Sequence, residues 1–132
     1  MREFEVKTER RTQLVNVTAD VRAALGGAGD ASAALVYVPH TTAGVTINEH
    51  IDGKLVTDLE EAFERIVDDG WPWKHVDADG SNGPSHGRAS LVGPQVLIPI
   101  RDGELALGRY QGIFFCEFDG PRARKVYVTT LS

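Results

Sequence analysis

Apolar and polar residues alternate in two short runs near the amino terminus, which is typical of strands with one buried face. Phe4 and Val6 alternate with charged residues, and the run from Leu14 to Val17 alternates in the same way. Charged residues stand between the two runs and predict a turn there. We therefore expect a β-hairpin at the start of the chain.

Two further strands are expected around a hydroxyl-rich loop. The segment "AALVYVP" is a continuous apolar run that is closed by a proline, and in "AGVTINE" Val45 and Ile47 alternate with polar residues. Both patterns indicate strands. The loop "HTT" lies between them, so His40 stands at a strand end, where side chains can converge on a ligand.

Three segments have the spacing of helices. From Thr18 to Leu25 apolar residues recur four apart, and the glycines that follow can end a helix by adopting positive φ. Beyond Asp52, a potential N-cap, a three- and four-residue apolar spacing predicts one longer amphipathic helix. A short helix is expected between Pro84, acceptable in a first turn, and Gly93. The residues of the long helix expected to face water are Glu60, Glu61, Glu64 and Arg65.

The last third of the chain contains four β-rich runs, at 95–100, 103–108, 112–118 and 124–131. Turn-forming residues separate them, and we expect three of the runs to form an antiparallel meander. The whole pattern predicts an α+β fold. Residues 1–132 would form one compact domain of mostly antiparallel mixed sheet, with one long and two short helices.

Composition narrows the class of protein. The chain has 132 residues, of which 42% are hydrophobic and 25% charged, as in ordinary globular proteins. The net charge of -5, without a basic stripe, argues against nucleic acid as a partner. No apolar run approaches the ~20 residues that span a bilayer, and the amino terminus lacks a signal-peptide pattern. We therefore expect a cytoplasmic protein without a membrane partner.

Three of the four histidines stand in or beside polar loops. His40, His75 and His86 could supply three neutral imidazoles to one divalent metal, zinc or similar, and leave a position open for water or substrate. Local spacings such as HExxH or CxxC are absent from the sequence, so surface or hydrogen-bonded histidines are the alternative. A carboxylate could orient an imidazole or act as a general base. The candidates for this role are Glu49, Asp77 and Asp79.

Two other segments could bind an anion. In "DGSNGPSHG" the glycines and Asn82 would let backbone N–H groups turn toward a phosphate, beside the start of a helix. The segment lacks the GK[ST] of a Walker loop, and an ordinary glycine-rich turn is the alternative. Arg122 and Arg124 could bind a phosphate or carboxylate bidentately. They could equally pair with Glu117 or Asp119 at a subunit interface.

Strand alternation constrains which residues can share a site. It places Asn48 and His50 on one face of their strand and Glu49 on the other. At most one of these two sets can therefore face the same pocket as His40.

The motifs together resemble one protein family. The segments "HTTAGVTINE", "DGSNGPSH" and "GELALGRYQGIFFCEFDGPRAR" occur in the order and spacing of the YjbQ-like family, also called the secondary thiamine-phosphate synthase family. The similarity covers about residues 39 to 128. It implies a compact α+β domain that assembles as a homotrimer, with pockets near the subunit interfaces.

The resemblance also assigns roles to residues. It implies catalytic roles for His40, His75, His86 and Glu49, with the three histidines as metal ligands. The residues that it implies for binding phosphate or substrate are Thr41, Thr42, Asn48, Gly80, Asn82, Ser85, Gln111, Arg122 and Arg124. The chain has Arg109 and Tyr110 where the family commonly has threonine and tryptophan, so one wall of the pocket can differ in shape.

The family name implies a reaction. Hydroxymethylpyrimidine diphosphate would condense with a thiazole phosphate and release pyrophosphate, which requires positioning and charge stabilisation more than a covalent nucleophile. Metal-assisted hydrolysis of a phosphorylated small molecule at the same histidines is an alternative. A second alternative is a trimeric protein that binds a phosphorylated metabolite without converting it.

Overall fold

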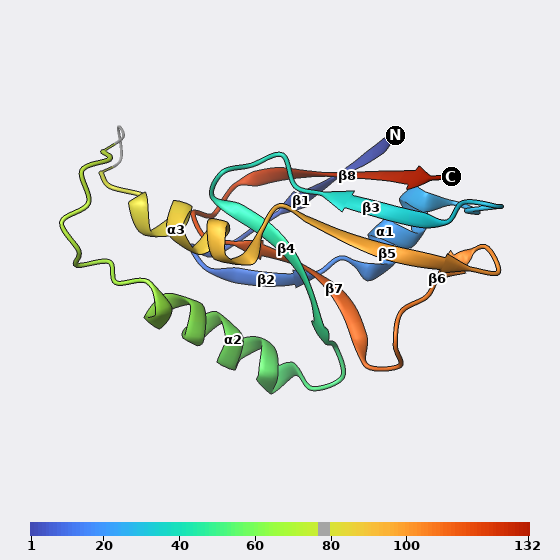
Figure 1. Cartoon of the computed structure of the whole chain (residues 1–132). Coiled ribbons are helices and arrows are strands. Elements are labelled where there is room, and N and C mark those ends of the chain that lie inside the picture. The colour runs from blue at the N-terminus through green and yellow to red at the C-terminus, as the bar shows by residue number, and fades with distance from the viewer. Residues whose placement is uncertain (77–79) are drawn as a thin grey trace.

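The computed structural model describes residues 1–76 and 80–132 (Figure 1). Within these residues the chain forms three helices and eight strands. The helices are α1 (Thr18–Leu25), α2 (Gly53–Ile66) and α3 (Gly83–Val92). The strands are β1 (Arg2–Lys7), β2 (Gln13–Asn16), β3 (Ala33–Tyr37), β4 (Ala43–Glu49), β5 (Gln95–Arg101), β6 (Glu104–Leu105), β7 (Gln111–Glu117) and β8 (Ala123–Leu131).

The described strands form two antiparallel sheets. The larger has the order β1-β8-β3-β5-β6, and the smaller has the order β2-β7-β4. In the smaller sheet Ala43 pairs with Glu117 and Glu49 pairs with Gln111, so β4 and β7 run side by side over their full lengths. This register places Gln111 at the carboxyl end of β4, and the loop that carries His40 lies at the other end.

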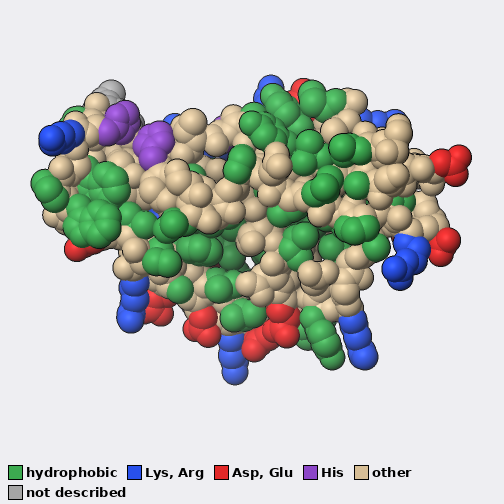
Figure 2. Space-filling view, in the orientation of Figure 1, with side chains coloured by type: hydrophobic (Ala, Val, Ile, Leu, Met, Phe, Trp, Pro, Cys, Tyr) green, Lys and Arg blue, Asp and Glu red, His purple; other side chains and the backbone are tan. Residues whose placement is uncertain are grey.

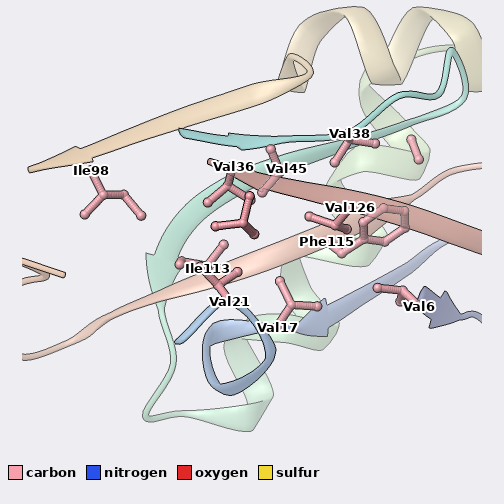
Figure 3. Packing of buried hydrophobic residues seen from close by; sticks show 12 residues of the cluster. Val6, Val17, Val21, Val36, Val38, Val45, Ile98, Ile113, Phe115 and Val126 are labelled. Carbon is pink, nitrogen blue, oxygen red and sulfur yellow. The ribbon is translucent and has the colours of Figure 1, made fainter. Parts of the chain in front are cut away.

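The two sheets and the helices make three layers. Side chains on one face of β7, such as Ile113 and Phe115, pack against the larger sheet together with Val17 and Val21 of the α1 region (Figure 3). The opposite face of β7 packs against α2 and α3. The residues of this second cluster include Leu14, Ala89, Phe114, Cys116 and Phe118. Both faces of β7 are therefore buried.

The α+β class, the antiparallel sheets and the three helices are as predicted, but two expected strand pairings are wrong. The first two strands do not form a hairpin, because β1 pairs with β8 and β2 pairs with β7. The expected meander is limited to the β5–β6 pair, because β7 lies in the other sheet. Alternation identifies a strand and its buried face, but it does not identify the partner strand.

Local signals place the helix ends correctly. The carboxylate of Asp52 accepts a hydrogen bond from the backbone N–H of Lys54, as an N-cap of α2 should. Gly26 and Gly93 follow α1 and α3 with positive φ values of 64° and 94°. No helix within the described residues is long and apolar enough to span a membrane.

Glu60 differs from its prediction, because it is buried and does not face water. Both of its carboxylate oxygens accept hydrogen bonds from Arg10, at 3.2 and 3.1 Å. One of them also accepts from the backbone N–H of Leu14 at 2.8 Å. A buried carboxylate requires such partners, and this cluster attaches α2 to the loop and strand before α1.

Arg88 connects α3 to the carboxyl end of α2. Its fully buried guanidinium donates to the carbonyls of Phe63, Glu64 and Val67 at 2.8, 3.0 and 2.8 Å. Carbonyls at the end of a helix lack intrahelical partners and carry partial negative charge, so a cation is favourable there. Arg88 thus fixes the position of α3, which carries His86, relative to α2.

Candidate functional site

His40 lies between β3 and β4 and is held by the neighbouring β8. Its Nε2 atom accepts a hydrogen bond from the backbone N–H of Lys125 at 2.9 Å. Partial burial lowers the pKa of His40, and the nearby charge of Arg124 lowers it further. A neutral ring that accepts through Nε2 carries its proton on Nδ1. His40 therefore presents an N–H donor on the side away from Lys125.

Three adjoining cavities connect the histidines along the surface. The first, of about 530 Å³, contains His40 and Arg124. The second, of about 350 Å³, shares His40 and Thr41 with the first and adds His86 and Ser90. The third, of about 300 Å³, shares His86 and Ser90 with the second and adds His75. We call these three cavities the histidine groove.

His75 and His86 form a pair in the groove. Their ring centroids lie 5.0 Å apart and the rings are nearly perpendicular, at 88°. Figure 2 shows histidine side chains gathered at the α3 end of the molecule, beside a hydrophobic surface. Trp73, two residues before His75, packs against Gly83, where an added Cβ would lie 2.4 Å from the indole ring. The absence of a side chain at Gly83 lets this segment lie close to α3.

The first turn of α3 has fewer free donors than the sequence suggested. The backbone N–H groups of Ser85 and His86 both donate to the carbonyl of Asn82, and Pro84 has no N–H. The hydroxyl of Ser85 is fully buried and donates to the carbonyl of Phe118 at 2.5 Å. What the turn offers an anion is mainly the positive end of the helix dipole. Gly80 is exposed, with a φ of 112°.

Arg124 is buried and paired. Its guanidinium donates to both carboxylate oxygens of Glu117, which is itself fully buried, and to the hydroxyl of Thr42 at 2.8 Å. Glu117 also accepts from Thr8 at 2.8 Å. The charge of Arg124 is therefore largely balanced inside the protein, and its main role in the groove is to hold the wall beside His40.

Arg122 lies near the amino end of α3. Its side chain donates to the carbonyl and the carboxylate of Asp119 at 2.8 and 2.9 Å. The same carboxylate accepts from the amide of Asn82 at 3.2 Å. Both arginines thus pair with the carboxylates considered as alternative partners, Glu117 and Asp119, and they do so within one chain.

The described residues of one chain do not assemble a metal site from the three histidines. No group of three or more His, Cys, Asp or Glu side chains within residues 1–76 and 80–132 is placed to hold a metal ion. His75 and His86 are close together, but Nε2 of His40 is occupied by Lys125. The proposed partners Asp77 and Asp79 lie outside the described residues.

The remaining candidates lie at the other end of β4. Glu49 pairs with Gln111 in the sheet, and Asn48 accepts a hydrogen bond from the N–H of Glu49 at 2.7 Å. Neither Asn48 nor Glu49 lines a cavity that contains His40. One chain therefore separates the expected site residues into two groups.

Gln111 lines a different cavity, of about 410 Å³, which the sequence did not reveal. We call it the arginine cavity. Its lining residues are Asn16, Thr18, Ala19, Arg22, His50, Arg109 and Gln111. An asparagine two residues before a helix-starting threonine is typical of an Asx-turn, and it could have drawn attention to Asn16 and Thr18. The sequence contains no local pattern that brings His50 to Arg109.

The fold and the groove together define a class: a three-layer α+β domain with a histidine-lined groove between the β3–β4 loop and α3. The chain belongs to the family described as UPF0047 protein YjbQ-like, whose model matches residues 2–132. It is 40% identical over 131 residues to the UPF0047 protein YugU of Bacillus subtilis, covering 97% of this chain and 96% of YugU.

Solved structures agree with this membership. An uncharacterized YjbQ/UPF0047 family protein from Clostridium acetobutylicum superposes with a TM-score of 0.90 at 39% identity, covering 99% of this chain and 100% of that one. A hypothetical protein from Aeropyrum pernix K1 gives a TM-score of 0.87 at 39% identity, covering 98% and 96%.

Proposed function

We propose that this protein is an enzyme that converts phosphorylated small molecules in the histidine groove, by the condensation that forms thiamine phosphate. The observation that carries the proposal is the close pair of His75 and His86 at the amino end of α3, in a run of cavities that reaches His40. The groove offers imidazoles and a helix dipole to an anionic substrate. The resemblance to the secondary thiamine-phosphate synthase family supplies the particular reaction.

The chemistry requires no activated side-chain nucleophile. The carbon–oxygen bond between the pyrimidine methylene and the diphosphate breaks, and the diphosphate leaves with the electron pair. The thiazole nitrogen forms the new carbon–nitrogen bond and becomes positively charged, so no proton is lost from it. Catalysis therefore consists of holding the two substrates together and stabilising the charge of the departing diphosphate.

The groove residues can divide this work. An imidazole N–H of the His75–His86 pair would donate to the departing diphosphate. His40, held neutral with its Nε2 engaged, would donate through Nδ1 and position a substrate oxygen. Arg124 would keep the wall in place through Thr42 and Glu117, since its charge is already balanced.

The test is pyrophosphate release from hydroxymethylpyrimidine diphosphate with and without the thiazole phosphate. We expect release that depends on the thiazole phosphate, with stoichiometric thiamine phosphate, and a loss of about 10²–10⁴-fold in His86→Ala. Arg65→Ala, an exposed substitution on α2 that removes a similar volume, should retain full activity. Phosphate released without the thiazole partner would favour hydrolysis, and tight binding without product would favour a binding protein. Either result would overturn the synthase proposal.

A homotrimer and a bound divalent metal, both implied by the resemblance, belong to this proposal as separate claims. Light scattering of the purified chain measures the number of copies. Metal content per chain, compared between wild type and His75→Ala prepared without a histidine tag, tests the metal. Near-stoichiometric metal that is lost in the variant would support a site completed by groups beyond the described residues of one chain.

A further inference from the structure

The arginine cavity shares no lining residue with the histidine groove. It lies beyond the carboxyl end of β4, between the start of α1 and the loop that leads into β7. Its volume of about 410 Å³ can hold a small organic molecule. Within one chain the cavity is therefore separate from the groove of the proposed synthase chemistry.

Two carboxamides in the cavity have their oxygens occupied. Oδ1 of Asn16 accepts from both the N–H and the hydroxyl of Thr18, at 3.0 and 2.7 Å. Oε1 of Gln111 accepts from the N–H of Gly108 at 2.7 Å. Among the described residues neither NH₂ group donates to a protein acceptor, so each can donate to a ligand. The hydroxyl of Thr18 is also occupied, because it accepts from the N–H of Ile113 at 2.8 Å.

The cavity also has two arginines that form no ion pair with the described carboxylates. Six arginines elsewhere make ion pairs with carboxylates: Arg10, Arg11, Arg65, Arg88, Arg122 and Arg124. Neither Arg22 nor Arg109 makes such a pair among the residues that the structure describes. Arg109 lies 5.6 Å from the ring centre of Tyr110, which leaves its N–H groups accessible.

The remaining lining groups add to the same electrostatic character. Ala19 lies in the first turn of α1, where the helix dipole is positive. Nε2 of His50 lies 3.4 Å from the carbonyl of Arg109, to which the tautomer with its proton on Nε2 would donate. Within the described part of the chain no Asp or Glu lines the cavity. The lining thus combines cations and hydrogen-bond donors.

We infer that the arginine cavity binds the phosphate group of a small organic phosphate, through Arg22, Arg109 and the amide groups of Asn16 and Gln111. A phosphate monoester carries about two negative charges at neutral pH, which matches two unpaired guanidinium groups better than a single carboxylate does. Guanidinium forks and amide donors suit its three oxygens. The volume leaves room for the organic part of the ligand.

The test follows backbone amides of the full-length chain by ¹H–¹⁵N NMR during titration with inorganic phosphate, at constant ionic strength set with chloride. Thr18, Ala19 and Gly112 report on the arginine cavity, and Gly83 and Gly87 report on the histidine groove. We expect saturable shifts at the first set in wild type.

Two variants locate the binding. In Arg22→Gln/Arg109→Gln the affinity for phosphate should fall about ten- to a hundredfold or more, as expected for lost charge-assisted hydrogen bonds. Both side chains are exposed, so the variant should keep a native spectrum. Arg65→Gln removes an exposed charge on α2 and should bind phosphate as wild type does.

The same titration separates this inference from the proposed function. Shifts confined to Gly83 and Gly87 would overturn the inference and leave the synthase proposal standing. Equal affinity in wild type and the double variant, or an absence of saturable shifts at Thr18, Ala19 and Gly112, would also overturn it. Shifts at these three amides that are lost in the double variant would support it, whatever the synthase assay shows.

Discussion

The backbone N–H of Lys125 donates a hydrogen bond to Nε2 of His40, a residue 85 positions earlier in the chain, at 2.9 Å. An imidazole that accepts through Nε2 must be neutral and protonated at Nδ1. One hydrogen bond from a residue near the start of β8 therefore fixes the tautomer of a groove residue. It also couples the protonation of His40 to the free energy of unfolding, because a protonated Nε2 cannot accept this hydrogen bond.

This relationship predicts a pH dependence of stability. Burial and the charge of Arg124 lower the folded-state pKa of His40 below its ordinary value of 6.5. The unfolded chain then takes up this proton more readily than the folded one. The contribution of His40 to the free energy of unfolding is present above pH 6.5 and is lost as the pH falls through the folded-state pKa.

His40→Gln supplies the comparison, because its amide oxygen can accept from Lys125 but does not titrate. Urea unfolding at neutral and mildly acidic pH should show a smaller loss of stability in the variant than in wild type. Equal losses in the two proteins would contradict the coupling. Nitrogen-15 NMR of the wild-type ring should show a protonated Nδ1 near neutral pH.

A second prediction concerns Gly83 and Gly87, which lie one turn apart on α3. In Gly83→Ala the new Cβ would meet the indole of Trp73 at 2.4 Å, whereas in Gly87→Ala the nearest atom is 3.5 Å away. We expect Gly83→Ala to lower stability by about 1–3 kcal/mol through overpacking and to change tryptophan fluorescence. Gly87→Ala should leave stability unchanged or raise it by up to about 1 kcal/mol through helix propensity.

The same two variants also test the groove, through their affinity for the proposed diphosphate substrate. Trp73 stands two residues before His75, so its displacement in Gly83→Ala should weaken the binding of this substrate at the His75–His86 pair. Gly87→Ala should leave that binding intact. Identical fluorescence and stability in the two variants would show that Trp73 does not depend on close packing against Gly83.

A third prediction tests the connection between α3 and α2. Arg88→Met keeps much of the volume of the side chain but leaves the carbonyls of Phe63, Glu64 and Val67 without their donor. We expect a loss of about 1–3 kcal/mol, the cost of leaving buried backbone acceptors without a donor. Urea unfolding measures it, with Arg65→Met expected within about 0.5 kcal/mol of wild type. A similar small effect in both variants would refute the anchoring role.

The helices and the sheet class could be predicted because their causes are local. Apolar spacing defines α2, the glycines end α1 and α3, and strand alternation identifies buried faces. Strand partners could not be predicted, because pairing β1 with β8 rather than β2 depends on contacts far apart in the sequence. The separation of His40 from Gln111 follows from the same long-range pairing.

The burial of Glu117 and Arg124 was accessible to sequence reasoning, although the charge of the "EFDGPRAR" segment suggested a surface site. Glu117 falls two residues after Phe115, and Arg124 two residues before Val126, so each lies on the core-facing side of its strand. A charge on a buried face indicates a buried partner. The pairing itself required the structure.

The last prediction follows from this buried pair. Glu117 accepts from Thr8 and from both nitrogens that Arg124 directs at it, so Glu117→Gln would leave Arg124 as an uncompensated buried cation. We expect a loss of about 3–5 kcal/mol in Glu117→Gln and a similar loss in Arg124→Met. The double variant should lose clearly less than the sum, because the second substitution removes a charge that the first has already left unpaired. Urea unfolding of all four proteins measures this coupling. Additive losses would mean that the two side chains stabilise the fold independently. The hydrogen bond from Arg124 to Thr42, and not the ion pair, would then hold the wall beside His40 in position.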